Sequence, residues 1–166
     1  SGDPEVSNVL VTQNDVRQIQ LAKAALYAGI KLLMDEMGVT TVDRIRLAGA
    51  FGSHISVSHA MVLGLIPDCD LEQVTSAGNA AGAGARMALL DRNARLEIAA
   101  TIAKAERIET AVADDFQAHF VGAMGLPHQS DPFPNLFSVV APPEAKVVES
   151  ADTPKRRRRR GPRASA

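Results

Sequence analysis

Apolar residues recur every three or four positions early in the chain, which is the spacing of one face of an α-helix. The helix is predicted to begin at Thr12, because Thr12 and Asp15 form a T-x-x-D capping signal. It is predicted to end near Met37, because Gly38 follows. At one position of this apolar stripe stands Lys23, whose ammonium group must be paired, reach solvent or face a polar cavity. The stripe, which we expect to face the core, consists of Val16, Ile19, Leu26, Ile30, Leu33 and Met37.

Strand and helix signals alternate after this helix. In order, we expect a strand over 42–48, a small-residue turn over 49–53, a short helix from Ser56 or Ser58 to Leu65, a strand over 71–76, helices over 78–90 and 92–105, a short strand over 107–110 and an amphipathic helix over 114–124. This alternation predicts an α/β fold with parallel or mixed strands. Proline spacing from residue 127 onward predicts little regular structure, with 128–166 largely disordered, and leaves Phe133 and Phe137 as candidates for docking on the body.

Composition limits the class of protein. The 166 residues are 46% hydrophobic, which suits one globular unit or one lobe of a larger one and excludes collagenous and disulfide-rich classes. Cys69 is the single cysteine, so nothing points to an oxidising compartment. No apolar run is long enough for a membrane helix, and the N-terminus lacks the features of a signal peptide. We therefore expect a cytoplasmic chain, cut from a longer one because it lacks an initiator methionine.

The net charge of −1 hides an uneven distribution. Residues 151–166 carry seven Lys and Arg against Asp152, which leaves 11 basic and 18 acidic residues, a net charge of −7, in 1–150. The acidic body is not expected to bind nucleic acid or a membrane. We interpret the end of the chain as a disordered polybasic tail, with a patch for RNA or anionic membrane as the alternative.

Two glycine-rich turns each follow a predicted strand. In α/β proteins ligands bind at the carboxyl ends of strands, so both turns are candidate ligand contacts. The first, L-A-G-A-F-G at 47–52, lacks the G-K-[ST] of a P-loop and the third glycine of a dinucleotide fingerprint. The second, G-N-A-A-G-A-G-A at 78–85, would allow close packing of a helix on the sheet or leave amides for an anion.

Four blocks in order make the pattern more specific: T-Q-N-D-V-R-Q-I-Q-L-A-K-A-A, I-R-L-A-G-A-F-G-S-H-I, L-G-L-I-P-D and A-G-N-A-A-G-A-G-A-R-M-A-L-L. From about Val9 to Pro127 the chain resembles the C-terminal domain of the ferredoxin-containing, ATP-dependent reductive activators of corrinoid proteins. These belong to the actin, sugar-kinase and heat-shock ATPase superfamily. The resemblance implies one lobe of a ribonuclease H-like fold over 1–127, a Pro-rich extension over 128–150 and the tail over 151–166.

The resemblance also implies a function and a site. In that family, electrons from an N-terminal [2Fe-2S] domain and the energy of ATP with Mg²⁺ restore cob(I)amide in the corrinoid protein of a methyltransferase system. The base and ribose would lie over the first glycine turn, with two side chains of the long helix on the nucleoside. The implied cofactor-binding residues are Gln20, Lys23, Gly49, Ala50, Phe51, Gly52, Gly78 and Asn79.

Parts of such an activator are missing from the chain. Cys69 alone cannot hold a cluster that needs four ligands, so [2Fe-2S] is expected only in the missing N-terminal domain. The first ATPase lobe, which positions Mg²⁺, is also missing, so no catalytic or metal-binding residue is assigned. We expect an ATP-dependent redox activase when full length and an inactive fragment alone. The expected partners are the corrinoid protein, the missing lobe and the ferredoxin domain, with a homodimer left open.

Two other functions remain as alternatives. One is the related activator of 2-hydroxyacyl-CoA dehydratases, in which each subunit supplies two cysteines, whereas this chain has only Cys69. The other is a non-catalytic interaction module with a basic tail. The acidic body and the inward position of Lys23 both disfavour this module.

Overall fold

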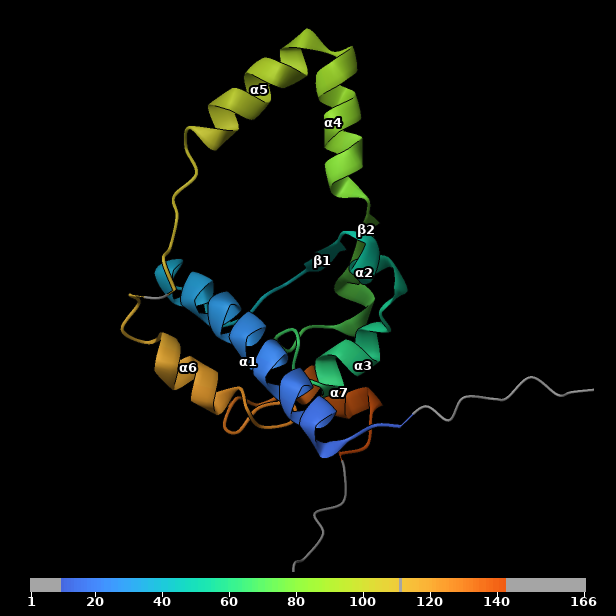
Figure 1. Ribbon diagram of the computed structural model, residues 1–166, viewed down its shortest axis with the longest axis vertical. Coiled ribbons are helices and arrows are strands. Elements are labelled where there is room, and N and C mark those ends of the chain that lie inside the picture. The colour runs from blue at the N-terminus through green and yellow to red at the C-terminus, as the bar shows by residue number, and fades with distance from the viewer. Residues whose placement is uncertain (1–9, 111, 143–166) are drawn as a thin grey trace, which may run out of the picture.

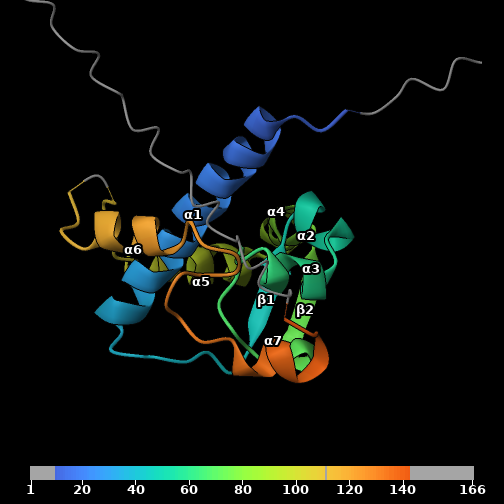
Figure 2. The same cartoon turned by 90° about the horizontal axis from the view of Figure 1, so that it is seen from below.

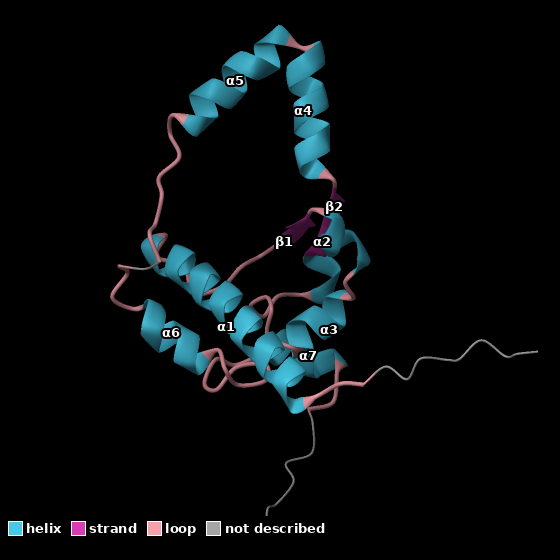
Figure 3. Cartoon of the chain, in the orientation of Figure 1, coloured by secondary structure: helices cyan, strands magenta, loops and turns pink. Residues whose placement is uncertain are grey.

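The structure is a computed structural model that describes residues 10–110 and 112–142, the side chains of Phe51 and Ser53 excepted (Figure 1). Its elements are α1 (Gln13–Glu36), β1 (Ile45–Ala48), α2 (Ala50–His54), α3 (Val57–Val62), a 3₁₀ turn (Leu71–Gln73), β2 (Val74–Gly78), α4 (Ala80–Leu90), α5 (Arg92–Ile102), α6 (Phe116–Gly122) and α7 (Pro134–Val139). Helices dominate the described chain, and the two strands lie side by side between them (Figure 3). The α/β class predicted from the sequence is confirmed.

Helix α1 begins as predicted. The side chain of Thr12 accepts a hydrogen bond from the backbone N–H of Asp15 at 3.2 Å, and the Asp15 carboxylate accepts one from the N–H of Thr12 at 2.8 Å. This reciprocal pair satisfies two N–H groups that the helix itself cannot use. Gly38 follows the helix with φ of +64°, a conformation that favours glycine.

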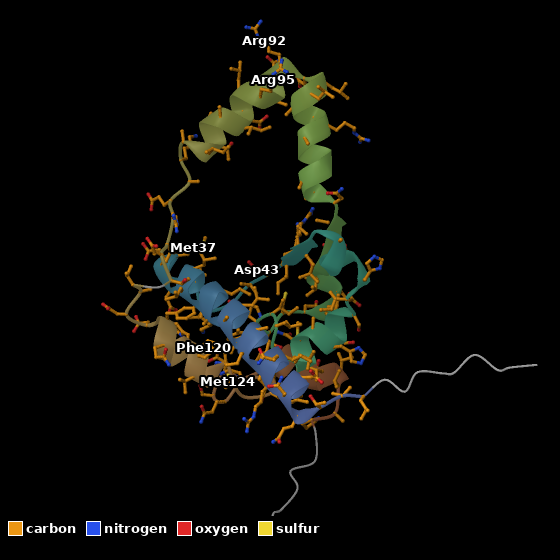
Figure 4. The ribbon with its side chains drawn as sticks, in the orientation of Figure 1. Met37, Asp43, Arg92, Arg95, Phe120 and Met124 are labelled. Atoms are coloured by element: carbon orange, nitrogen blue, oxygen red, sulfur yellow. The ribbon has the colours of Figure 1, made fainter. Side chains whose placement is uncertain are left out.

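The predicted core stripe of α1 is wrong. Leu26 and Leu33 are 51% and 54% exposed, and the other large apolar members at 16, 19 and 37 are also exposed. The buried face lies beside the stripe and consists of Lys23, Ala24, Tyr27, Ala28, Leu32 and Met34. Helix α6 runs along α1 (Figure 2), and Phe120 and Met124 pack against the core (Figure 4). Tertiary packing therefore selected the face on which two alanines allow close approach, rather than the face with the larger side chains.

Strands β1 and β2 are parallel, with Ile45 opposite Val74, as the α/β prediction requires. Each is shorter than predicted at its start. The residues before β2 form the 3₁₀ turn because the carboxylate of Asp70 accepts the N–H of Glu72 at 3.0 Å. The predicted turn at 49–53 is confined to Gly49, and the prediction is wrong for 50–53, because α2 begins at Ala50.

Helices α3, α4, α5 and α6 form where predicted but end earlier or begin later. Helix α3 ends at Val62, because Gly64 takes φ of +70° where the chain passes the carbonyl of Pro127. The predicted strand at 107–110 is wrong, because these residues have no neighbouring strand with which to form a ladder. The rings of Phe116 and Phe120 on α6 stack with their centroids 6.0 Å apart.

The predicted lack of structure after residue 127 is wrong for 128–142. Helix α7 lies in this segment, and the side chains of Phe133 and Leu136 are 2% and 0% exposed in the core. Its N-terminus is capped by a residue distant in sequence: the carboxylate of Asp68 accepts the N–H of Asn135 and the N–H of Leu136, both at 3.0 Å. A local reading of the proline-rich sequence could not detect this long-range cap.

Residues 143–166, which include the basic run, lie outside the described residues. The division of the chain at 127/128 and 150/151 stays a prediction. Within the described residues no helix is both long and apolar enough to cross a membrane.

Replacing the remote cap should destabilise α7. Asp68→Ala removes acceptors from two helix N–H groups and from the Asn135 side chain, so the free energy of unfolding should fall by about 1–3 kcal/mol. Urea denaturation measures the change. Asp114→Ala, at an exposed carboxylate, is the control and should change stability by less than about 0.5 kcal/mol. Equal midpoints for the two variants would contradict the capping role.

Candidate functional site

The two glycine turns meet at the carboxyl ends of the parallel strands. Gly49, after β1, has φ of +94°, and Gly78, at the end of β2, has φ of +59°. The backbone N–H of Gly49 donates to the carbonyl of Gly78 at 2.8 Å. A Cβ built at either position would meet nothing within 4 Å. Both glycines are therefore explained by backbone conformation rather than by packing, and the space beside them is open.

The neighbours of these glycines have different roles. Ala50 and Asn79 are exposed beside the turns. The side-chain oxygen of Asn79 caps α4 by accepting the N–H of Gly82 at 2.9 Å. Gly52 is buried, and a Cβ there would lie 2.9 Å from the backbone of Leu47, so close helix–strand packing explains this glycine. Of the predicted cluster, the structure brings together Gly49, Ala50, Gly78 and Asn79, and the Phe51 side chain lies outside the described part of the chain.

Gln20 and Lys23 are directed to a different part of the molecule. The ammonium group of Lys23 donates to the carbonyls of Gly125 and of Pro127, the latter at 2.8 Å. One turn earlier, the amide of Gln20 donates to the carbonyl of Met124 at 3.4 Å. Lys23 is 0% exposed, and burial lowers the pKa of its ammonium group. In the described structure both predicted nucleoside ligands therefore hold the segment after α6, and their contact with a nucleoside stays a prediction.

A polar cluster that the sequence analysis missed lies beside Lys23. The hydroxyl of Tyr27 donates to the carboxylate of Asp131 at 2.9 Å, and the ammonium group of Lys31 lies 3.3 Å from the same oxygen. The ring of His128 lies beside that of Tyr27, with centroids 5.0 Å apart and ring planes tilted by 33°. Positions 23, 27 and 31 follow i, i+4 spacing, so a search for a polar stripe on the helix could have found this face.

Burial and mutual contacts shift the pKa values of the groups in this cluster. Burial raises the pKa of the Tyr27 hydroxyl, and the neighbouring Asp131 carboxylate raises it further. Burial alone would raise the pKa of Asp131, but the Tyr27 hydrogen bond and the nearby His128 and Lys31 hold it below its ordinary value. Burial lowers the pKa of His128. These shifts favour the charged form of the Asp131 carboxylate and the neutral form of the His128 ring.

The described residues offer no metal-binding set. No three His, Cys, Asp or Glu side chains among them lie close enough together to hold a metal ion. Cys69 is a free, buried thiol, and burial together with the charges of Asp70, Asp68 and Asp43 raises its pKa. Its reactive thiolate form is thereby disfavoured.

Among the described residues, a nucleotide is compatible with the glycine turns, where a Cβ on Gly49 or Gly78 would meet nothing within 4 Å and where the 11-residue helix α4 begins. The ammonium group of Lys23 and the side-chain amide of Gln20 donate to backbone carbonyls of 124–127. A parallel α/β lobe with two glycine turns at one end of its strands is the arrangement expected of an ATPase lobe of the actin, sugar-kinase and heat-shock class.

Comparison with known proteins agrees with this class. A family model described as the C-terminal domain of RACo, the ASKHA domain, matches residues 2–137, and the chain belongs to this family. Over 92 residues the chain is 44% identical to the corrinoid activation enzyme RamQ of Eubacterium limosum, a match that covers 54% of this chain and 16% of RamQ. The solved structure of a reductive activator for corrinoid, iron-sulfur protein matches with a TM-score of 0.65 and 33% identity, over 71% of this chain and 19% of that one. The chain thus spans less than a fifth of the length of either relative.

Removing the Lys23 ammonium group should destabilise the fold. Lys23→Met keeps the aliphatic stem but leaves two buried carbonyls without their donor, so the free energy of unfolding should fall by about 1–3 kcal/mol. The control is Lys31→Met on the same helix, whose ion pair is partly exposed and should contribute less than about 1 kcal/mol. Chemical denaturation of both variants measures the difference. A Lys23→Met protein as stable as Lys31→Met would exclude an anchoring role.

Low pH should reduce the contribution of His128 to the stability of the fold. The Nδ1 atom of His128 accepts the N–H of Asp131 at 2.8 Å and that of Ser130 at 3.2 Å, so protonation of Nδ1 breaks both bonds. The folded pKa lies below the ordinary value of 6.5, so just below pH 6.5 the unfolded chain binds more protons. The His128 contribution to stability should therefore be complete above pH 6.5 and decline as the pH falls through the folded pKa.

Denaturation midpoints measured from pH 7.5 to pH 5 test this dependence. His128→Asn keeps an acceptor near Nδ1 but cannot be protonated, so its stability should fall less with acid than that of the wild type. His54→Asn, at an exposed histidine, should follow the wild type. If the two variants share one pH profile, His128 is not the titrating group.

Proposed function

We propose that the chain is the C-terminal part of an ATP-dependent reductive activator of corrinoid proteins. Its family, and relatives named as a corrinoid activation enzyme and as a reductive activator for corrinoid, iron-sulfur protein, support this function. The proposed reaction of the longer protein is a one-electron transfer, in which a reduced [2Fe-2S] cluster in another domain loses an electron and cob(II)amide gains it as cob(I)amide. The proposed acceptor is the corrinoid protein of a methyltransferase system.

The proposed role of this chain is to supply the nucleoside side of the ATP site. The observation that carries it is the pair of glycine turns, joined by the hydrogen bond from Gly49 to Gly78 at the ends of β1 and β2. An open glycine lets the base and ribose approach the backbone of 49–51, where any side chain would intervene. Asn79 and the start of α4 lie on the second side of the same site.

Gln20 and Lys23 belong to the proposed site under one condition. Their donors must leave the carbonyls of 124–127 before they can reach a nucleoside, because Lys23 is fully buried against that segment. The proposed nucleotide contacts therefore rest first on the glycine turns. Mg²⁺ and the groups that activate water for ATP hydrolysis would come from the other lobe of the longer protein, and this chain alone would be inactive.

Filling the space beside Gly49 should weaken ATP binding. In the full-length activator, Gly49→Val places a branched side chain where the nucleoside would lie, and the dissociation constant for ATP should rise at least about tenfold. Gly38→Val is a matched control, because Gly38 also has a positive φ and open space around its Cβ but lies after α1. Both variants carry backbone strain, because φ is +94° at Gly49 and +64° at Gly38, whereas only Gly49 lies at the proposed site.

Calorimetric titration with ATP measures the affinities, and melting temperatures report folding. Gly49→Ala and Gly38→Ala form a second, milder pair if the valine variants do not fold. Unchanged ATP affinity in a folded Gly49 variant would remove the glycine turn from the site. An equal loss in both members of a pair would show backbone strain instead of a ligand contact.

A further inference from the structure

A cavity of about 240 Å³ lies between α1, the connection that follows α1 and the start of α7. Three residues of the polar cluster, Tyr27, Lys31 and Asp131, line it together with Asp68, the residue that caps α7. Pockets that hold drug-sized ligands have volumes of roughly 300–1,000 Å³. This cavity is smaller, so it suits a group of the size of one side chain.

Carboxylates outnumber cations in the lining of the cavity. Among the described lining residues, Asp68 and Asp131 carry negative charge and Lys31 alone carries positive charge. Asp43 and Asp70 lie near enough to Asp68 for the charges of all three to act on the same buried thiol. The cavity therefore favours a positively charged occupant over an anion.

The Asp131 carboxylate has room for a further donor. The Tyr27 hydroxyl and the Lys31 ammonium group both approach one oxygen, Oδ2, at 2.9 Å and 3.3 Å. The other oxygen, Oδ1, lies 3.7 Å from Nδ1 of His128, which already accepts the backbone N–H of Asp131. A carboxylate offers about four acceptor positions. Because the side chain is 27% exposed, a donor of a ligand can reach the positions that remain.

A guanidinium group matches this lining better than an ammonium group. It is planar and weakly hydrated, and it donates two parallel hydrogen bonds to a carboxylate. The apolar part of the lining includes the rigid rings of Pro67, Pro132 and Pro134, which can pack against a flat group. An ammonium group holds its water more strongly and would lose more on entering such a cavity.

We propose that this cavity binds an arginine side chain, and that its occupant is one of the five consecutive arginines at 156–160 of the same chain. This basic run is the feature of the sequence that the proposed function leaves unused. It follows a body, 1–150, whose net charge is −7. The contact requires neither nucleotide nor any other part of an activator.

The chain leaves the described residues close to the cavity. Pro134 and Asn135 line the cavity at the start of α7, and the described chain ends at Pro142. A helix of six residues, the length of α7, is only about 9 Å long. A random coil of 14 residues, the separation of 142 and 156, spans about 20 Å on average, and an extended chain of that length spans about 46 Å. The basic run can therefore reach the cavity, and a tether this short gives it an effective concentration on the order of millimolar.

A nitroxide at the end of the chain tests which surface the basic run contacts. Ser165→Cys supplies the attachment point, because the natural thiol of Cys69 is buried. In the ¹⁵N-labelled 166-residue chain, the nitroxide should broaden the amide signals of Thr41 and Asn135, which line the cavity, more than that of Thr75 on β2. Unaffected signals of Thr41 and Asn135 overturn the proposal.

Two further samples identify the contact and the copy that makes it. The broadening should be lost in Asp131→Asn and in a chain whose five arginines at 156–160 are replaced by glutamine, and its persistence in either overturns the proposal. A mixture of nitroxide-bearing chain with ¹⁵N-labelled chain that lacks the nitroxide should show no broadening. Equal broadening in this mixture overturns the contact within one chain in favour of a second copy.

Melting temperatures provide a second readout, which stands even if Asp131→Asn does not fold. Replacing the five arginines by glutamine should lower the melting temperature of the 166-residue chain by about 2–4 °C. In the Thr41→Lys background the same replacement should lower it by less than about 1 °C, because the new ammonium group at this exposed lining residue repels the run. Thr110→Lys, at an exposed position outside the cavity, is the matched control and should leave the effect intact. Equal effects in the two backgrounds overturn the proposal.

Titration with oligouridylate tests RNA as the partner of the run instead. If the cavity holds the run, Asp131→Asn should bind oligouridylate more tightly than the wild type, because the substitution releases the arginines. Equal, measurable affinities of the two chains overturn the proposal in favour of RNA. None of these measurements uses ATP, so failure of the nucleotide site and failure of this cavity are separate results.

Discussion

The contact on which the described core depends is that of the buried Lys23 ammonium group with the carbonyls of Gly125 and Pro127. An ammonium group taken out of water needs several acceptors, and the backbone after α6 supplies them. The contact fixes where this segment meets α1. His128 and Asp131 follow shortly afterwards in the chain. Their hydrogen bonds to the backbone and to Tyr27 extend this contact into a polar seam between α1 and residues 124–131. Loss of the ammonium group would therefore affect the whole seam between α1 and 124–131.

The seam also brings the C-terminal described residues into the core. Once 124–131 lies on α1, Phe133 and Leu136 reach the cluster that contains Met61 and Cys69. Asp68 then caps α7 from the other side of this core. Long-range contacts thus order a proline-rich segment, in which Pro134 at the first turn of α7 is a local signal for a helix start.

The candidate site and the seam lie on different parts of the lobe and use different chemistry. The glycine turns provide open backbone at the ends of β1 and β2, whereas Lys23 and Gln20 saturate carbonyls in the interior. Helix α4 begins directly at the second turn, where Asn79 caps it.

Local sequence determined the elements whose signals are contained within a few residues. The capping box at Thr12, the parallel strands ending at Gly49 and Gly78, and the cap of α4 by Asn79 are all of this kind. The family blocks likewise predicted the family and the glycine turns. Tertiary structure alone decided which face of α1 is buried, where Lys23 points and that α7 forms. Each of these depends on a partner about 65 or more residues away, such as Asp68 for α7 or Pro127 for Lys23, and no local periodicity encodes such a partner.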